Sequence, residues 1–475
     1  MLFQSFDYLF VFLPITLVLY SVFARTSFAN VVLFVASVFF YAYYDYRFIA
    51  FLFASAFGDY YLGRYIAQTE DAARRKFLIA GSIFLNLGLL FVLKYSGWLS
   101  IELNYVTAWL GFGAVVTPLI LPLPAGISFY TFQTLSYTID VYRKHRPAHK
   151  NLLDYLSFVT FFPHLVAGPI MRSTDLLPQL ARRRDIVSPQ IVASSLFLIA
   201  WGLTKKLVFA DNFGDIADHV ELTMPGAGII FTYAFAFQIY CDFSAYSDIA
   251  IGSAKLFNID LRRNFLTPYL SLSPQDFWRR WHISLSTWLR DYLYVPIGGN
   301  RGEAAETIRN LIITMTLCGL WHGAGFLFAL WGFYHGVLLV AYRYLPIDKY
   351  LRAAFGGAAG SALAMFLTFN LICIGWALFR AHSFAEIGTL WTSTAALFTL
   401  QPAVWQHFFG YFGVFLLFAV PLFATDLVGY WRDCEFPDLR DNLPTWLTVT
   451  LYVVMFYAIV WFGKRTSNAF IYFQF

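Results

Sequence analysis

The sequence predicts an all-α protein that crosses a membrane many times, and three observations carry that prediction. Of its 475 residues, 59% are hydrophobic and only 13% are charged, whereas about 25% of the residues in a soluble domain are charged. The apolar residues form runs of roughly 17–25 residues, the length that an α-helix needs to cross a hydrocarbon core about 30 Å thick. These runs are apolar at both odd and even positions, whereas the strands of a membrane β-barrel alternate between apolar and polar residues. We therefore expect transmembrane helices and not a barrel.

The apolar runs follow one another along the whole chain. In chain order the candidate spans are 7–24, 29–45, 47–66, 77–96, 104–122, 125–141, 152–170, 188–209, 226–253, 308–322, 324–345, 360–379, 408–429 and 445–463. Some are too short or too polar to cross, so we expect about eleven crossings plus re-entrant segments. Asp7 rather than a basic cluster precedes the first run, which therefore predicts a retained span and no cleavable signal peptide. Two stretches, 122–126 and 163–169, are candidates for broken elements. No repeat or linker divides the chain, and we expect one integral domain over 1–475.

The positive charge lies in short clusters between the apolar runs. Lys and Arg residues gather at 74–76, 143–150, 182–184 and 262–263, a pattern typical of cytoplasmic loops under the positive-inside rule. We assign these loops to the cytoplasmic side of the lipid bilayer, and the net charge of +5 does not indicate nucleic acid as a partner. The four cysteines are far apart and lack metal-ligand spacing, so the sequence predicts neither a metal site nor a disulfide framework.

The least hydrophobic long stretch, 254–307, contains a predicted amphipathic helix. Ser273 is a candidate N-cap, and Pro274 occupies the first turn. Apolar and aromatic residues then recur at helical spacing and form one face: Trp278, Trp281, His282, Leu285, Trp288, Leu289 and Tyr292. We expect one continuous helix that turns His282 and the tryptophans into the protein, places Arg279 on another face, and ends in the turn-rich segment 294–302.

An ionisable residue lies in the apolar stretch that follows. His322 is in a segment with no Asp, Glu, Lys or Arg between Arg309 and Arg343. A titratable group at bilayer depth is costly unless it faces protein or water, so it predicts a functional site. Trp321 supplies a flat wall and an N–H donor, and Gly323 removes side-chain bulk. Imidazole can accept a proton from a hydroxyl at neutral pH, and an activated donor such as a thioester needs no protein nucleophile.

Other polar groups in apolar segments have weaker signals. Cys318 lies four residues before His322 on the same helical face, so a Cys–His pair stays open as an alternative. Asp242 and Asp248 are six residues apart, about 120° around a helix, which disfavours a joint dyad and favours structural or orienting roles. Packing roles are expected for three further histidines, His164, His335 and His407.

Several motifs resemble the membrane-bound O-acyltransferase (MBOAT) family, within it the bacterial branch that contains alginate O-acetyltransferase and the teichoic-acid D-alanyl transferase. The motifs are Phe277–Tyr294, Gly298–Gly302 and Leu320–Gly323, with support from Pro124–Tyr130, Ile139–Tyr142, Phe162–Pro169 and Asp242–Asp248. The resemblance covers most of residues 5–345. The C-terminal segment Phe470–Phe475 is similar to the polysaccharide O-acetylase members.

The resemblance implies an MBOAT fold, with tilted transmembrane, re-entrant and amphipathic helices around a central tunnel and a catalytic core at about 120–345. It implies that His322 is the essential active-site histidine. It also implies that His282, which many eukaryotic members replace by asparagine, has an orienting or donor-binding role. Trp321, Gly323, Trp278, Trp281 and Asp242 would support the site. Arg279, Arg280, Asn300 and Arg301 would help to hold an anionic donor, although headgroup anchoring explains the arginines as well.

These inferences together predict an O-acetyltransferase for a bacterial exopolysaccharide such as alginate, multi-pass in the inner membrane. The co-substrate would be an acyl thioester, either acetyl-CoA or a carrier-bound acetyl group, and no tightly bound cofactor is expected. A periplasmic or extracellular partner of the SGNH type would complete the transfer to the polysaccharide. A proton-coupled transporter, which should show inverted repeats, and a non-catalytic scaffold of a secretion complex are the alternatives.

Overall fold

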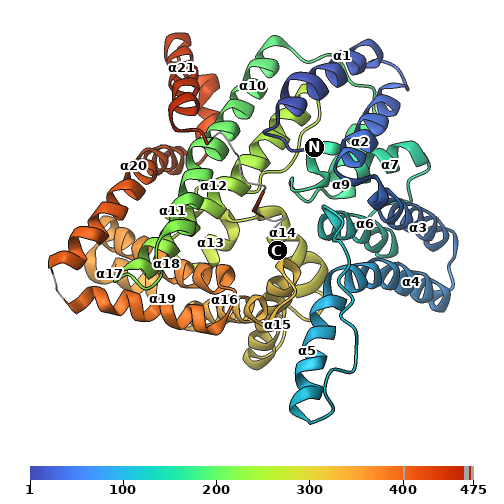
Figure 1. The fold of residues 1–475 in the computed structure, drawn as a ribbon. Helices are drawn as coiled ribbons and strands as arrows, with labels where there is room; N and C mark the ends of the chain where they lie inside the picture. Colours follow the sequence, from blue (N-terminus) through green and yellow to red (C-terminus); the bar gives the residue numbers. More distant parts are fainter. Residues whose placement is uncertain (400–401, 465–469, 472–475) are drawn as a thin grey trace. The chain divides into compact units, whose positions relative to one another are not determined.

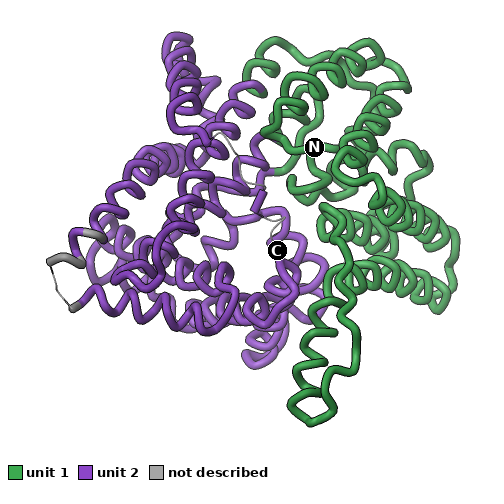
Figure 2. The backbone as a smooth tube through the Cα atoms, viewed as in Figure 1, with its two compact units in different colours: residues 1–195, 250–262 green, residues 196–249, 263–475 purple. Residues whose placement is uncertain are grey.

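The chain folds into helices joined by short connections (Figure 1). The computed structural model describes residues 1–399, 402–464 and 470–471, which contain α-, 3₁₀- and π-helices and no strand. The chain forms two compact units, residues 1–195 with 250–262 and residues 196–249 with 263–475 (Figure 2). We call them the first and the second unit. The prediction of an all-α protein is confirmed, and that of a single domain stays a prediction.

The first unit holds the N-terminal helices. They are η1 (Asp7–Phe12), α1 (Leu13–Phe23), α2 (Ala29–Asp45), η2 (Tyr46–Phe48), α3 (Ile49–Gln68), α4 (Ala72–Leu90), η3 (Phe91–Tyr95), α5 (Ser96–Trp109), α6 (Ile127–Tyr142), α7 (Leu152–Thr160), α8 (Phe162–Leu165) and α9 (Ser173–Ala181). Both stretches expected to be broken are irregular: residues 113–126 contain no helix, and α8 has only four residues. One buried polar cluster joins two of these helices, since Ser82 and Asn86 of α4 donate to Asp59 of α3 at 2.5 and 2.7 Å.

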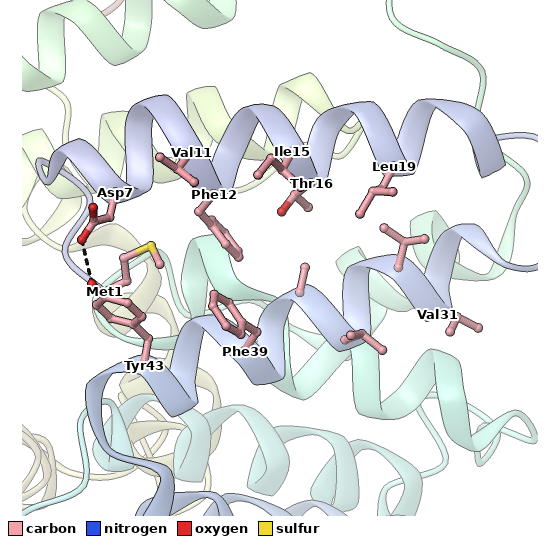
Figure 3. Close-up of a pocket in the computed structure, with 13 residues that line it drawn as sticks. Met1, Asp7, Val11, Phe12, Ile15, Thr16, Leu19, Val31, Phe39 and Tyr43 are labelled. Atoms are coloured by element: carbon pink, nitrogen blue, oxygen red, sulfur yellow. Dashed lines mark hydrogen bonds between the residues drawn. The ribbon is translucent and has the colours of Figure 1, made fainter.

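An apolar groove of about 660 Å³ lies between α1 and α2 in the first unit. Figure 3 shows side chains such as Val11, Leu19 and Phe39 along its two walls. At one end the hydroxyl of Tyr43 donates a hydrogen bond to Asp7 at 2.7 Å. Apolar side chains exposed over a continuous surface mark contact with a membrane or a partner. The groove is therefore a surface suited to bilayer hydrocarbon.

The second unit holds the C-terminal helices. They are η4 (Lys205–Ala210), α11 (Asp211–His219), η5 (Pro268–Leu270), α13 (Pro274–Arg280), α14 (Ile283–Leu289), η6 (Arg290–Tyr294), α15 (Ala304–His322), α16 (Phe326–Tyr344), α17 (Ile347–Phe355), α18 (Gly357–Arg380), α19 (Phe384–Ala396), η7 (Leu397–Thr399), α20 (Pro402–Arg432), η8 (Phe436–Asn442) and α21 (Thr445–Phe462). Two further helices, α10 (Pro189–Thr204) and α12 (Ala227–Leu256), contribute residues to both units. Ser273 caps α13 as predicted, because its hydroxyl accepts the Asp276 N–H at 3.2 Å.

Seven segments in the described part of the chain are long and apolar enough to cross a membrane. They are Ala29–Gln68, Ala72–Trp109, Pro189–His219, Phe326–Tyr344, Gly357–Arg380, Phe408–Arg432 and Thr445–Phe462. Two of them are 40 and 38 residues long, and a single crossing takes only about 20 residues. The chain is thus a multi-pass membrane protein, while the expected number of about eleven crossings stays a prediction.

Candidate active site

The second unit places His322 at the end of a helical hairpin. His322 is the last residue of α15, and α16 begins four residues later at Phe326. The two helices approach closely because a Cβ on Gly319 or on Gly332 would overlap the opposite backbone, at the carbonyl oxygens of Phe328 and Met315 respectively. His322 is 4% exposed. It therefore lies in the protein interior, where membrane proteins tolerate titratable side chains.

Three aromatic rings contact the imidazole of His322 edge to face. The ring centroids of Trp321, Trp331 and Phe379 lie 4.9, 5.2 and 5.4 Å from it, with interplanar angles of 84°, 86° and 75°. Three aromatic rings against a buried imidazole exclude water from it. The rings thus hold the imidazole of His322 in place in an apolar environment. Gly323 makes room for this packing, because a side chain there would overlap the ring of Phe328.

His282 lies in a backbone break between α13 and α14. Its φ and ψ are 41° and 55°, the left-handed region, and the residue is 0% exposed. Its ring lies 4.6 Å from Phe243 of α12 and 6.0 Å from Trp321. Burial lowers the pKa of His282 to about 3, so its imidazole is neutral at physiological pH. Trp321 therefore contacts both histidines: His322, which follows it in α15, and His282, which lies in the break between α13 and α14.

The prediction of one continuous helix from Ser273 to Tyr292 was wrong, and hydrogen bonds explain the break. The segment around Asn264 supplies the partners that helical carbonyls would otherwise supply. The N–H of Ile283 donates to the Asn264 carbonyl at 2.9 Å, and the hydroxyl of Ser284 donates to the Asn264 side chain at 2.6 Å. The helical spacing of the aromatic residues continues across the break because α13 and α14 each bury an aromatic face.

The two predicted tryptophans occupy different parts of the aromatic core. Trp278 lies 5.9 Å from Trp331, which contacts His322. Trp281 packs instead against Trp376 at 4.9 Å and Phe277 at 5.4 Å. Trp278 is thus linked to the site through one ring, whereas Trp281 supports the core beside it.

Of the four residues expected at a donor site, two have contacts with other side chains and two are exposed. Arg280 forms a salt bridge with Asp276 at 2.9 Å, one turn earlier on α13. Asn300 accepts hydrogen bonds from the Tyr294 hydroxyl and from Arg343, the latter at 3.1 Å. Arg279 and Arg301 are exposed. A role in donor binding stays a prediction for all four.

Asp242 and Asp248 form ion pairs with two buried lysines that adjoin each other in η4. The Nζ of Lys205 lies 2.6 Å from Asp248, and that of Lys206 lies 2.9 Å from both Asp242 and Asp211. All of these side chains are at most 4% exposed. The pairing satisfies the requirement that carboxylates in an apolar helix have partners.

Asp242 also binds the C-terminal segment. Asp242 accepts the N–H of Ile471 at 2.7 Å, and the ring of Phe470 lies 4.1 Å from that of Tyr246. Phe470 also lies 5.9 Å from Phe243, the ring that contacts His282. Of the C-terminal motif, residues 472–475 lie outside the described residues, as does the side chain of His407.

The sequence comparisons decide the family. A profile described as MBOAT, membrane-bound O-acyltransferase family, matches residues 38–347, which is more than half of the chain and includes both histidines. The chain belongs to this family. The acyltransferase is 40% identical over 411 residues to the probable alginate O-acetylase AlgI of Pseudomonas aeruginosa, covering 86% of this chain and 76% of that protein. It is 35% identical over 418 residues to the peptidoglycan O-acetyltransferase of Helicobacter pylori, covering 81% and 77%. It is 25% identical over 280 residues to the teichoic acid D-alanyltransferase of Bacillus subtilis, covering 54% and 69%.

The acyltransferase site also contains residues that sequence reasoning missed. Trp331, nine residues after His322, could have been found as the next tryptophan, on the returning helix α16. Phe379 and Phe243 come from α18 and α12 and have no local signal, because only the tertiary fold brings them to the histidines. The pair Lys205–Lys206 at the end of an apolar run was a visible signal for partners of the buried aspartates.

Proposed function

We propose that this acyltransferase moves an acetyl group from a thioester donor towards the hydroxyl of an exopolysaccharide such as alginate. The observation that carries the proposal is the buried His322, enclosed by Trp321, Trp331 and Phe379 at 4.9–5.4 Å. The similarity to a probable alginate O-acetylase supports the acetyl group and the acceptor. The similarity to the peptidoglycan O-acetyltransferase of Helicobacter pylori makes peptidoglycan the alternative acceptor.

In the proposed reaction His322 moves one proton. A hydroxyl oxygen, on the polysaccharide or on the partner that passes the acetyl group to it, attacks the carbonyl carbon of the thioester, and the hydroxyl proton passes to a ring nitrogen of His322 as the C–O bond forms. The C–S bond then breaks, and the imidazolium returns the proton to the departing thiolate. The aromatic rings around His322 exclude water, which protects the thioester from hydrolysis.

His282 has a supporting role in this proposal. Its pKa of about 3 keeps the imidazole neutral, so it can orient a reacting group or the wall at Trp321 but holds no charge at pH 7. Its left-handed backbone costs roughly 1–3 kcal/mol, and such strain gathers at functional sites. His282 is therefore a positioning residue in the proposal, and His322 is the proton acceptor.

The donor and partners belong to the same proposal. The thioester would be acetyl-CoA or a carrier-bound acetyl group on the cytosolic side, acting as co-substrate and not as a bound cofactor. The chain would lie in the bacterial inner membrane. A separate SGNH-type acetyltransferase on the periplasmic or extracellular side would complete the transfer to the polysaccharide.

The test is the O-acetyl content of the secreted polysaccharide in cells that carry His322→Ala. The matched control is His219→Ala, because His219 is also a helix-terminal histidine but its side chain is 75% exposed. Membrane abundance of both variants is adjusted to that of the wild type. We expect His322→Ala to lose O-acetyl groups while polymer export and the control stay at wild-type level.

Other outcomes would contradict the proposal in distinct ways. Unchanged acetylation in His322→Ala would remove His322 from the reaction. Lost export with little change in acetyl groups per sugar would favour a transporter instead. Tolerance of every histidine substitution would favour a scaffold.

A further inference from the structure

A third histidine, His335 of α16, contacts the same indole as His322. The residue is 0% exposed. Its ring centroid lies 4.7 Å from that of Trp331, and that of His322 lies 5.2 Å from the same ring. A second contact joins His335 to Trp278 at 5.3 Å, with the rings at 84°. Trp331 is therefore held between the proposed proton acceptor and a histidine that the sequence assigned to packing.

The polar atoms of this cluster are hard to explain by packing. Among the described residues, neither ring nitrogen of His335 has a hydrogen-bond partner, and the same holds for the indole N–H groups of Trp278 and Trp331. Trp278 is 9% and Trp331 0% exposed. A buried polar group without a partner costs stability, and an apolar ring of the same shape would avoid that cost. A phenylalanine would serve packing better than His335 does.

The backbone leaves room for the ring of His335. Gly375 of α18 faces it, and a Cβ added at Gly375 would lie 2.7 Å from Nε2 of His335. Real Cβ atoms do not approach a ring atom this closely, so the absence of a side chain at residue 375 lets α18 close over the imidazole. The ring is thus fixed from α13, α16 and α18 together.

We propose that His335 is a positioning residue of the acyl-transfer site. The ring of His335 is inclined at 84° to that of Trp278 and at 62° to that of Trp331, which allows its nitrogens to interact with the faces and edges of the two indoles. These interactions fix Trp331 in the orientation in which it contacts His322. The inference rests on the proposed function of His322 and adds a residue that sets the orientation of the wall beside it.

Two substitutions distinguish the effect of the ring nitrogens of His335 from the effect of its ring shape. His335→Phe keeps the aromatic shape and removes both nitrogens, whereas His335→Gln keeps hydrogen-bonding groups without the ring. O-acetyl groups per sugar are measured in the secreted polymer at low, matched abundance, and the thermal midpoint is measured on the purified full-length chain. We expect His335→Phe to lose about tenfold in acetylation with an unchanged or higher midpoint, and His335→Gln to recover part of the loss.

His164→Phe is the matched control. His164 is 2% exposed, but its Nε2 has a partner, the Gln133 side chain at 3.4 Å, in the first unit. Its substitution is expected to lower the thermal midpoint, with acetylation following abundance only. Activity that falls while stability does not is therefore specific to His335.

The outcomes that would overturn the inference differ from those that would overturn the proposed function. Wild-type acetylation in His335→Phe, with His322→Ala inactive in the same strain, would overturn the role of His335 alone. Loss of abundance and of the thermal midpoint in both His335 variants would make it a packing residue. Wild-type acetylation in His322→Ala would instead contradict the proposed function itself.

Discussion

Lys206→Met is expected to lower the free energy of unfolding by about 3–5 kcal/mol, the usual cost of removing one partner from a buried ion pair. The Nζ of Lys206 lies 2.9 Å from Asp211 and from Asp242, and all three side chains are 2% exposed. Methionine leaves two carboxylates buried without this cation. The expected loss lies at the upper end of the range, because one lysine serves two carboxylates.

The assay is thermal unfolding of the purified chain in detergent, together with its abundance in membranes. The matched control is Lys464→Met, which removes a lysine from a single ion pair with Asp215 at 2.8 Å, where the side chains are 37% and 48% exposed. Such a surface pair contributes about 0–1 kcal/mol. Lys206→Met should therefore lower the midpoint far more than Lys464→Met does.

Equal shifts in the two variants would refute this reasoning about buried charge. A second variant tests its cause, because Asp242→Asn added to Lys206→Met removes one of the two uncompensated carboxylates. The double variant should be more stable than Lys206→Met alone, which is the non-additivity expected of residues in one network. If the two losses simply added, Lys206 and Asp242 would not interact as the structure indicates.

Three further outcomes follow from the described contacts. Gly332→Ala should lower the thermal midpoint because its Cβ would overlap the Met315 carbonyl oxygen, whereas Gly388→Ala, which meets open space in α19, should leave it unchanged or raise it; equal midpoints would contradict the close packing. Asn264→Ala should lower acetyl groups per sugar more than abundance, because it removes the acceptor of Ser284 beside His282; acetylation that only tracks abundance would contradict this. Burial lowers the pKa of His282 from 6.5 to about 3, so below about pH 6.5 the unfolded chain binds a proton that the folded chain does not. The free energy of unfolding therefore decreases as the pH decreases. The thermal midpoints at pH 7 and pH 5 should differ less in His282→Phe than in the wild type.

The sequence could predict the helical class because that class depends on local properties. Run length and low charge follow directly from the hydrocarbon thickness, and the cap at Ser273 depends on residues within one turn. The break at His282 could not be found in this way. It depends on hydrogen bonds that Ile283 and Ser284 donate to Asn264, eighteen residues before His282, and the aromatic pattern continues through the break as if the helix were whole.

The candidate site shows the same division. His322, Trp321 and Gly323 adjoin in sequence, so their contact is predictable. Phe379 contacts His322 only because α18 packs on the α15–α16 hairpin. In the sequence His335 looks like any histidine in an apolar segment. Only its three-dimensional contacts with Trp278 and Trp331 distinguish it.

The two histidines of the site are placed by unrelated backbone features, and this separates their roles. His322 is placed by the close approach of α15 and α16 at Gly319 and Gly332, and three aromatic rings contact its imidazole. His282 is placed by a left-handed break, and burial keeps it neutral. In the proposed reaction the proton of the acceptor hydroxyl passes to His322, while burial disfavours the protonated form of His282 across Trp321. Disturbing the hairpin should consequently act on proton transfer, whereas disturbing the break should act on the orientation of Trp321.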